Sequence, residues 1–234
     1  SIRVIDKQSD DMTRVRSLYT QVFNDTERFT EYFFRNEAAS SSTVILGAFI
    51  EKNIVSVMFL LEKSLIWNGI REKGCYIYGV ATAPGYRGKG YMRRLMEYGL
   101  NYCESNKYRI IYLIPVDEKI YDGLGFVSVR KAKRVDIIHE ENKAELMAAE
   151  LSIGEAVYIE KIIHGDKEKI CEASSFAMTA DKLKGGIWEE KDVSYFCRRV
   201  LQAEAENAGI YIVRDNKGKI KEVIITGADE DRGI

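Results

Sequence analysis

A glycine-rich turn with two basic residues carries the clearest chemical signal in the sequence. It reads Arg87-Gly88-Lys89-Gly90 and lies between an apolar, strand-like stretch and a helical stretch. Glycines let the backbone curl, so that successive N–H groups point into one concavity. The first N–H groups of the next helix lack intrahelical partners, and the helix dipole adds partial positive charge there. The turn therefore predicts a pyrophosphate site, to which Arg87 and Lys89 add charge.

Other glycine-rich phosphate loops fit this stretch less well. A Walker loop needs serine or threonine after Gly-Lys, where this chain has Gly90. A dinucleotide fingerprint counted from Gly88 needs a third glycine where the chain has Arg93. A tight strand-to-helix turn without a ligand is the plain alternative. We prefer the phosphate site because a strand is expected before the turn and an amphipathic helix after it.

The elements that must position the turn follow from the hydrophobic period. Ser9 is a good helix N-cap, and Asn68-Gly69 is a strong hairpin turn. The expected elements are, in chain order, a strand at 2–5, helices after Ser9 and from Thr26, strands at 43–50, 54–61, 64–67 and 74–82, a helix from Gly90, a strand at 108–114, a helix at 117–124, and a strand at 126–138.

Two of these elements are predicted in more detail. The helix from Gly90 should bury one face, formed by Met92, Leu95, Met96, Gly99 and Cys103. The stretch 108–114 is uninterruptedly apolar and suits the middle of a sheet. Gly125 is expected at the C′ position after the short helix.

The stretch from Val80 to Met92 resembles motif A of the GNAT superfamily of N-acetyltransferases. That motif runs Arg or Gln, two residues, Gly, one residue, and Gly or Ala; Met92 departs from its last position. A second stretch, from Tyr121 to Phe126, is similar to the Tyr-x-x-Leu-Gly-Phe signature of the same superfamily. The resemblance covers residues 1–138, and the expected order of strands and helices agrees with it.

The resemblance implies a mixed α+β GNAT fold, with a mostly antiparallel, twisted central sheet flanked by helices. It also implies that the chain uses acetyl-CoA as a cosubstrate. Val80, Ala81 and Thr82 would lie along the pantetheine arm in a gap between splayed strands. The backbone N–H groups from Arg87, Gly88, Lys89, Gly90, Tyr91 and Met92 would hold the diphosphate.

Tyr121 is the candidate catalytic acid, because it stands in the signature and its hydroxyl pKa is near 10, close to that of a thiol. A packing tyrosine at a helix end is the alternative. The base is left open, since no carboxylate lies between Gly74 and Thr82, where many members have a glutamate near the position of Tyr76. The candidates are a water chain, an amine that arrives deprotonated, or one of the carboxylates of Glu72, Glu27, Glu31 and Glu37.

Composition narrows the partners. The chain has 234 residues and a formal net charge of -1, which argues against a dedicated nucleic-acid binder. No stretch is apolar enough to span a bilayer and no signal peptide is evident, so we expect a cytoplasmic protein without a membrane partner. Its 4 cysteines form no CxxC pair, and we expect buried free thiols and no metal site. A homo-oligomer is compatible with the sequence.

We expect two regions, a GNAT domain at 1–140 and a smaller α+β region at 141–234, which would be a second, degenerate GNAT-like domain. In that region 142–151 and 188–207 read as helices, and 210–213 and 220–225 as a hairpin. The motif context is similar to acetyltransferases of the enhanced-intracellular-survival type. The predicted function is acetyl transfer to a primary amine of a small molecule or peptide. A non-catalytic acyl-CoA sensor is the alternative.

Overall fold

The structure is a computed structural model that describes residues 1–129, 157–182 and 186–227. These residues form two compact units. Unit 1 consists of residues 1–126 and 186–190, and unit 2 consists of residues 127–129, 157–182 and 191–227. The predicted boundary after residue 140 lies outside the described residues, as do the predicted helix at 142–151 and most of the strand predicted at 126–138.

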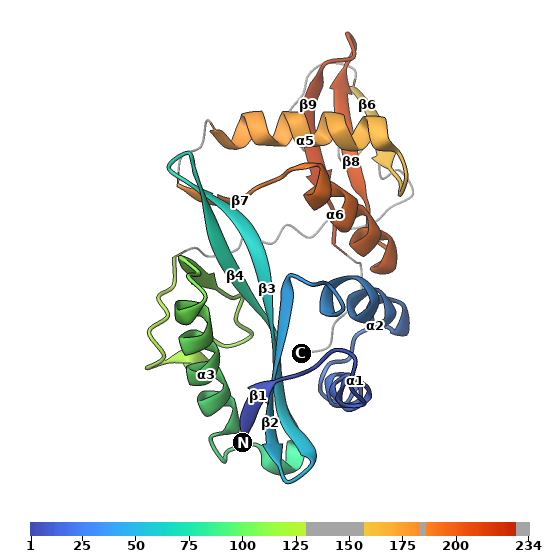
Figure 1. Cartoon of the computed structure of the whole chain (residues 1–234). Coiled ribbons are helices and arrows are strands. Elements are labelled where there is room, and N and C mark those ends of the chain that lie inside the picture. The colour runs from blue at the N-terminus through green and yellow to red at the C-terminus, as the bar shows by residue number, and fades with distance from the viewer. Residues whose placement is uncertain (130–156, 183–185, 228–234) are drawn as a thin grey trace. The chain divides into compact units, whose positions relative to one another are not determined.

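Unit 1 is a mixed sheet with helices on both faces (Figure 1). The strand order is β1-β2-β3-β4-β5, with β7 added to β3, and β4 and β5 form the parallel pair. This confirms the predicted α+β class with a mostly antiparallel sheet. The elements of unit 1 are β1 (Ile2–Val4), α1 (Asp11–Val22), α2 (Glu27–Tyr32), η1 (Phe33–Ala38), β2 (Thr43–Ile50), β3 (Asn53–Trp67), β4 (Ile70–Thr82), η2 (Pro84–Tyr86), α3 (Tyr91–Ser105), β5 (Ile110–Tyr112), η3 (Glu118–Tyr121) and β7 (Ile187–Glu189).

The antiparallel meander β2–β3–β4 is the frame of the sheet. Asn68 and Gly69 have φ of 49° and 80°, so the predicted two-residue turn is confirmed and pairs Trp67 with Ile70. The segments predicted as two strands, 54–61 and 64–67, form the single strand β3. One long strand arises because β4 pairs with it along most of its length.

Strand β7 covers the part of β3 that β2 leaves open. The last β2 partner on β3 is Leu61, and β7 pairs with Leu65–Trp67. The prediction of a helix from residue 188 is therefore wrong at its start. That helix, α6 (Val193–Ala205), begins after Asp192, whose side chain accepts from the Tyr195 N–H at 2.7 Å and caps it.

Helix α3 covers one face of the sheet, and α1 and α2 lie over the other (Figure 1). Gly99 lets α3 approach closely, because a Cβ atom there would lie 1.9 Å from Met58 Cε. The predicted buried face of this helix is confirmed, with Met92 half-buried at its start. The buried residues of this core are Leu46, Ala48, Val55, Met58, Leu60, Cys75, Ile77, Leu95, Met96 and Cys103.

The opposite face carries a cluster of aromatic rings. Tyr19 of α1 is fully buried and stacks on Phe33, with ring centroids 5.3 Å apart. Phe33 meets Phe59 of β3 edge-on at 5.0 Å. Helix α1 begins later than predicted, because Asp10 is its N-cap and the Ser9 hydroxyl instead donates to the Asp6 carbonyl.

Two short elements follow α3. The predicted strand 108–114 is reduced to β5, which pairs with β4 and has no strand on its other side among the described residues. It does not lie in the middle of the sheet as expected. The helix predicted at 117–124 is only the 3₁₀ turn η3, which Asp117 caps through the Lys119 N–H. Gly125 follows with φ of 83°, as a glycine-requiring position.

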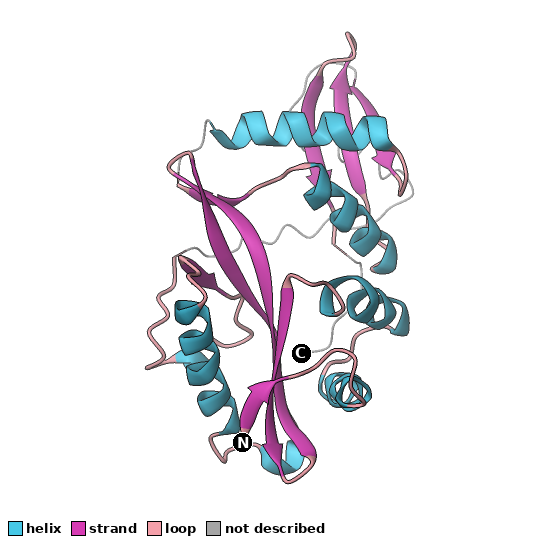
Figure 2. Cartoon of the chain, in the orientation of Figure 1, coloured by secondary structure: helices cyan, strands magenta, loops and turns pink. Residues whose placement is uncertain are grey.

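Unit 2 is a three-stranded antiparallel sheet, in the order β6-β8-β9, with two helices (Figure 2). The predicted hairpin around residues 215–218 is confirmed, whereas β6 and α5 were not anticipated. Phe196 and Ile210 are buried in its core together with Ile162. The elements are β6 (Val157–Ile162), α5 (Lys167–Lys182), α6, β8 (Ile210–Asp215) and β9 (Ile220–Ile225).

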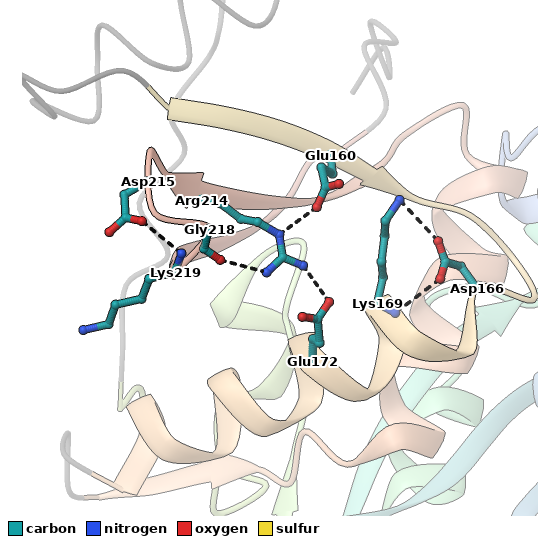
Figure 3. A network of polar contacts seen from close by, with 8 residues as sticks. All are labelled: Glu160, Asp166, Lys169, Glu172, Arg214, Asp215, Gly218 and Lys219. Atoms are coloured by element: carbon teal, nitrogen blue, oxygen red, sulfur yellow. Dashed lines mark hydrogen bonds and ion pairs between the residues drawn. The ribbon is translucent and has the colours of Figure 1, made fainter.

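Arg214 ties three elements of unit 2 together (Figure 3). Its guanidinium donates to Glu160 of β6 at 2.7 Å, to Glu172 of α5 at 2.6 Å and to the Gly218 carbonyl at 3.2 Å. The two carboxylates raise the pKa of Arg214 further above its ordinary value, Glu172 contributing most. This network stabilises the packing of β6 and α5 against the β8–β9 hairpin.

All four cysteines are free thiols. Cys75 and Cys103 are buried, as predicted, but Cys171 is exposed on α5 and Cys197 is half-buried. Among the described helices, none joins enough length to enough apolar character to cross a membrane.

Candidate active site

The glycine-rich turn joins the end of β4 to the start of α3. Gly88 and Gly90 have φ of 72° and 75°, which L side chains rarely adopt. A Cβ atom at either position would meet no atom within 4 Å. Glycine is therefore required here by backbone conformation and not by crowding, and the backbone of the turn stays open to a ligand.

The first N–H groups of α3 have no intrahelical acceptor. The first backbone hydrogen bond of this turn runs from the Arg94 N–H to the Gly90 carbonyl at 3.1 Å. Gly90 is the N-cap and has no side-chain oxygen to offer. The N–H groups of Tyr91, Met92 and Arg93 thus lie where orphan donors and the positive end of the helix dipole coincide. This combination suits the binding of an anion such as a diphosphate.

The basic side chains of the turn brace its own backbone. Arg87 Nε donates to the Thr82 carbonyl at 3.2 Å, and Lys89 Nζ donates to the Gly85 carbonyl at 2.9 Å. Both side chains are exposed, so their positive charge lies at the rim of the turn. Met92, which departs from the expected small residue, packs inward against the core beneath α3.

Strands β4 and β5 part in front of the turn. Their pairing ends at Tyr76 opposite Tyr112, while β4 continues to Thr82. In the described part of the chain, the backbone groups of 77–82 on that side have no strand partner. Unpaired backbone groups at a strand edge are ready to pair with an extended ligand. Val80, Ala81 and Thr82 lie on this open stretch.

A β-bulge bends the open stretch of β4. Two residues, Gly79 and Val80, lie opposite Met58, between the pairs Phe59–Tyr78 and Val57–Ala81. Gly79 has φ of 58°, and a Cβ atom there would lie 2.9 Å from the Phe59 ring. Only glycine meets both conditions, so the bulge is fixed by this residue.

Tyr121 lies at the end of η3, on the same core as the turn. It is half-buried, packs against the core beneath α3 together with Val80 and Met92, and meets Phe126 edge-on at 6.0 Å. Arg93 of α3 donates to the Asp122 carbonyl at 2.9 Å and so fastens this segment to the first turn of the helix. Burial raises the pKa of Tyr121, so the hydroxyl keeps its proton at neutral pH.

Tyr76 takes the position where a carboxylate was sought on β4. Its ring stacks on Tyr112 at 5.1 Å and lies 6.0 Å from Tyr78. Burial is the main cause that raises the pKa of Tyr76, and the charges of Glu189 and Tyr121 add to it.

Three of the four carboxylates named as candidate bases have partners elsewhere. Glu31 is exposed and pairs with Arg16 at 2.9 Å. Glu37 accepts from the Tyr32 hydroxyl at 3.0 Å, and Glu72 lies 3.8 Å from Arg109. For Glu27 the structure places the residue in the first turn of α2 on the surface.

The Asp25 carboxylate is connected to β4 through the hydroxyl groups of Tyr19 and Tyr78, an arrangement that the sequence did not predict. The Tyr19 hydroxyl donates to Asp25 Oδ2 at 2.6 Å and lies 3.1 Å from the Tyr78 hydroxyl. Nothing in the helical spacing of Tyr19 indicates a partner on β4. Asp25 lies in the loop between α1 and α2.

Comparison with known proteins places this geometry in a family. A family model described as an acetyltransferase (GNAT) domain matches residues 3–129. No curated protein matches the sequence. The enhanced-intracellular-survival subgroup is not confirmed by these comparisons and stays a prediction.

One solved structure shows the same fold. A conserved protein of unknown function from Enterococcus faecalis V583, a probable N-acyltransferase, has a TM-score of 0.68 and 18% identity, over 96% of this chain and 54% of its own. A predicted acetyltransferase with acetyl-CoA from Clostridium acetobutylicum has a TM-score of 0.49 and 16% identity, over 58% and 95%. This chain thus spans 54% of the length of the Enterococcus protein. The predicted fold is confirmed by the first of these structures.

Proposed function

We propose that this chain, which belongs to the GNAT family of acetyltransferases, binds acetyl-CoA and moves its acetyl group to a primary amine of a small molecule or peptide. The single observation that carries the proposal is the turn at Gly88 and Gly90. There, left-handed glycines expose the first N–H groups of α3 beside the open stretch of β4. A ligand with a diphosphate and an extended amide-bearing arm fits both features at once.

Binding would use the backbone more than side chains. The diphosphate would accept from the N–H groups between Arg87 and Met92. The pantetheine arm would pair with β4 along Val80, Ala81 and Thr82, much as an added strand pairs with a sheet edge. Arg87 and Lys89 would contribute charge at the rim, which raises the association rate and makes binding sensitive to salt.

The reaction would proceed by direct attack. The neutral amine nitrogen forms a bond to the thioester carbonyl carbon, and the carbonyl oxygen becomes an oxyanion that N–H donors stabilise. The C–S bond then breaks, and the sulfur takes the proton of the Tyr121 hydroxyl. The amine nitrogen loses one proton, so that the products are the acetamide and coenzyme A.

Two measurements on the full chain test this proposal. Titration calorimetry with coenzyme A and acetyl-CoA reports binding directly. A thiol-release assay with acetyl-CoA, over a panel of small primary amines and peptides with free N-termini, reports turnover. We expect saturable binding of both thiol and thioester, and amine-dependent release. The absence of binding to either would refute the site at the turn.

A non-catalytic acyl-CoA sensor is the second candidate. It is favoured by one observation, that no carboxylate lies on β4 between Gly74 and Thr82. A sensor would bind acetyl-CoA by calorimetry and release no thiol with any amine of the panel. Amine-dependent release excludes it.

A further inference from the structure

Three hydrogen-bonded groups lead from the open stretch of β4 to the surface loop between α1 and α2. Tyr78 lies on β4, Tyr19 on α1, and Asp25 in the loop. The Tyr19 ring is 0% exposed and is enclosed by Phe33, Phe34 and Phe59. Asp25 and Tyr78 at the two ends are each partly exposed.

The direction of the two hydrogen bonds that join Tyr78, Tyr19 and Asp25 follows from the chemistry of these groups. A carboxylate only accepts hydrogen bonds, and a phenol has a single proton to donate. Because Tyr19 gives its proton to Asp25 at 2.6 Å, Tyr78 must be the donor in the 3.1 Å contact between the hydroxyls. The Tyr78 oxygen therefore acts toward any further partner as an acceptor, which is the role that an N–H group of an amine requires.

The first group, Tyr78, lies on the open stretch of β4, two residues before Val80, where the proposed pantetheine site begins. Tyr78 follows Tyr76, the last residue of β4 that pairs with β5. The rings of Tyr76 and Tyr78 are 6.0 Å apart. Burial above all, and then the nearby Tyr78 and Asp25, raise the pKa of Tyr19. Tyr19 therefore stays neutral. It can pass a proton to Asp25 only if it receives another proton from Tyr78 at the same time.

We propose that Tyr78 accepts the proton that leaves the acceptor amine, and that Tyr19 and Asp25 carry it to the surface. This inference rests on the proposed acetyl transfer. Formation of the C–N bond places positive charge on nitrogen and makes its N–H acidic. That proton passes to the Tyr78 oxygen, the Tyr78 proton to Tyr19, and the Tyr19 proton to Asp25, which becomes a carboxylic acid and releases it to water. Tyr121 protonates the leaving sulfur separately and is reprotonated from water.

A purely structural role for the Tyr19 hydroxyl would not need both of its hydrogen bonds. A buried hydroxyl is satisfied by one partner, which Asp25 already provides for Tyr19. The second contact, to Tyr78, connects the buried group to the open stretch of β4. In this assignment Tyr78 is the catalytic residue, and Tyr19 and Asp25 act through it.

The test compares three conservative variants, Tyr78→Phe, Tyr19→Phe and Asp25→Asn, in the thiol-release assay with one amine at saturation. Each removes a proton site with little change of shape. We expect each to lower kcat by about 100-fold or more, the usual contribution of a positioned base. The KM for acetyl-CoA should stay within about threefold, since the backbone groups proposed to hold the coenzyme are unchanged. Because a relay acts as a unit, the double variant Tyr78→Phe/Asp25→Asn should be no slower than either single variant.

The controls are a second tyrosine–carboxylate pair of unit 1. Tyr108 donates to Glu62 at 3.0 Å, and neither residue lies in the turn or on β4, so Tyr108→Phe and Glu62→Gln should leave kcat unchanged. Thermal unfolding of every variant separates a lost fold from a lost relay. Unchanged kcat in Asp25→Asn or Tyr19→Phe, or losses that multiply in the double variant, would overturn the relay while wild-type turnover still upholds the acetyltransferase. A wild-type chain that binds acetyl-CoA without turnover would remove both.

Discussion

Tyr76 and Tyr112 form the last pair that joins β4 to β5, and their rings stack with centroids 5.1 Å apart and planes 25° from parallel. Beyond this pair the two strands separate, and β4 alone continues to Thr82. The stack therefore holds the fork of the sheet at a defined residue. Any ligand that enters between the strands meets this pair at the inner end of the opening.

Tyr112→Leu should weaken the fork while keeping apolar bulk. We expect the free energy of unfolding to fall by about 1 kcal/mol, the usual worth of an aromatic pair. The Kd for coenzyme A should rise as well, because the unpaired edge of β4 is less well fixed. Urea unfolding and calorimetry measure the two effects. Tyr98→Leu, at an exposed position on α3, is the control that should change neither. Lower stability with unchanged affinity would show that the fork does not shape the coenzyme site.

Gly90→Ala should weaken coenzyme binding beyond its effect on stability. A left-handed alanine costs about 1–2 kcal/mol, and relief of that strain turns the N–H groups of the turn away from the diphosphate. We expect Kd for coenzyme A to rise by about tenfold or more, since 1.4 kcal/mol is a factor of ten. The matched control is Gly218→Ala, in the unit 2 hairpin, which has φ of 78° and equally open space. Equal loss of affinity in both variants would refute the turn as the binding site.

Tyr121→Phe should lower kcat by about 100-fold, the usual contribution of a positioned acid. Burial raises the pKa of Tyr121 above its ordinary value of 10.0, and the active form is the protonated one. The activity that depends on Tyr121 is therefore fully present below pH 10 and is lost only as pH rises through the higher folded value. Between pH 7 and 10, ionisation of Tyr121 should therefore cause no fall in kcat. No falling limb in this range should be present in the wild type and absent from Tyr121→Phe. Such a limb would contradict the raised pKa of Tyr121, whereas an unchanged kcat would remove Tyr121 as the acid.

Glu190→Gln should destabilise the chain in a pH-dependent way. Glu190 is buried and accepts from Arg71 and from Ser64. Chiefly the Arg71 guanidinium holds the pKa of Glu190 below its usual 4.5. A depressed carboxyl pKa contributes stability above the unfolded value, and that contribution is lost as pH falls through the folded value. Urea unfolding should show a loss of about 1 kcal/mol at pH 7, which shrinks as the pH falls below 4.5. A constant difference at all pH values would mean that the ionised pair is not responsible.

Much of unit 1 could be predicted from sequence because its signals are local. The Asn68-Gly69 turn, strand β2 and the buried face of α3 each follow from neighbouring residues, and each is confirmed. The turn at Gly88 and Gly90 has the backbone conformation that its glycines indicate. What the turn binds stays a proposal.

The errors arise where tertiary pairing outweighs local pattern. The apolar stretch 108–114 forms only the short β5, because β4 departs from it after Tyr76. Residues 187–189 suit a helix or a strand by composition, and the open edge of β3 decides for a strand. The contact between Tyr19 and Tyr78 links α1 to β4 across the chain, so no spacing in the sequence announces it.

Strand β7 gives the molecule a particular order of assembly. When residues 1–129 have left the ribosome, the segment Leu65–Trp67 of β3 still lacks its partner β7, because β7 follows α5 in the chain. Folding of the first sheet is therefore completed only after much of unit 2 has been synthesised. A fragment cut at residue 129 would leave this edge open to strands of other copies. Expression of residues 1–129 by themselves should consequently favour aggregates over a stable monomer.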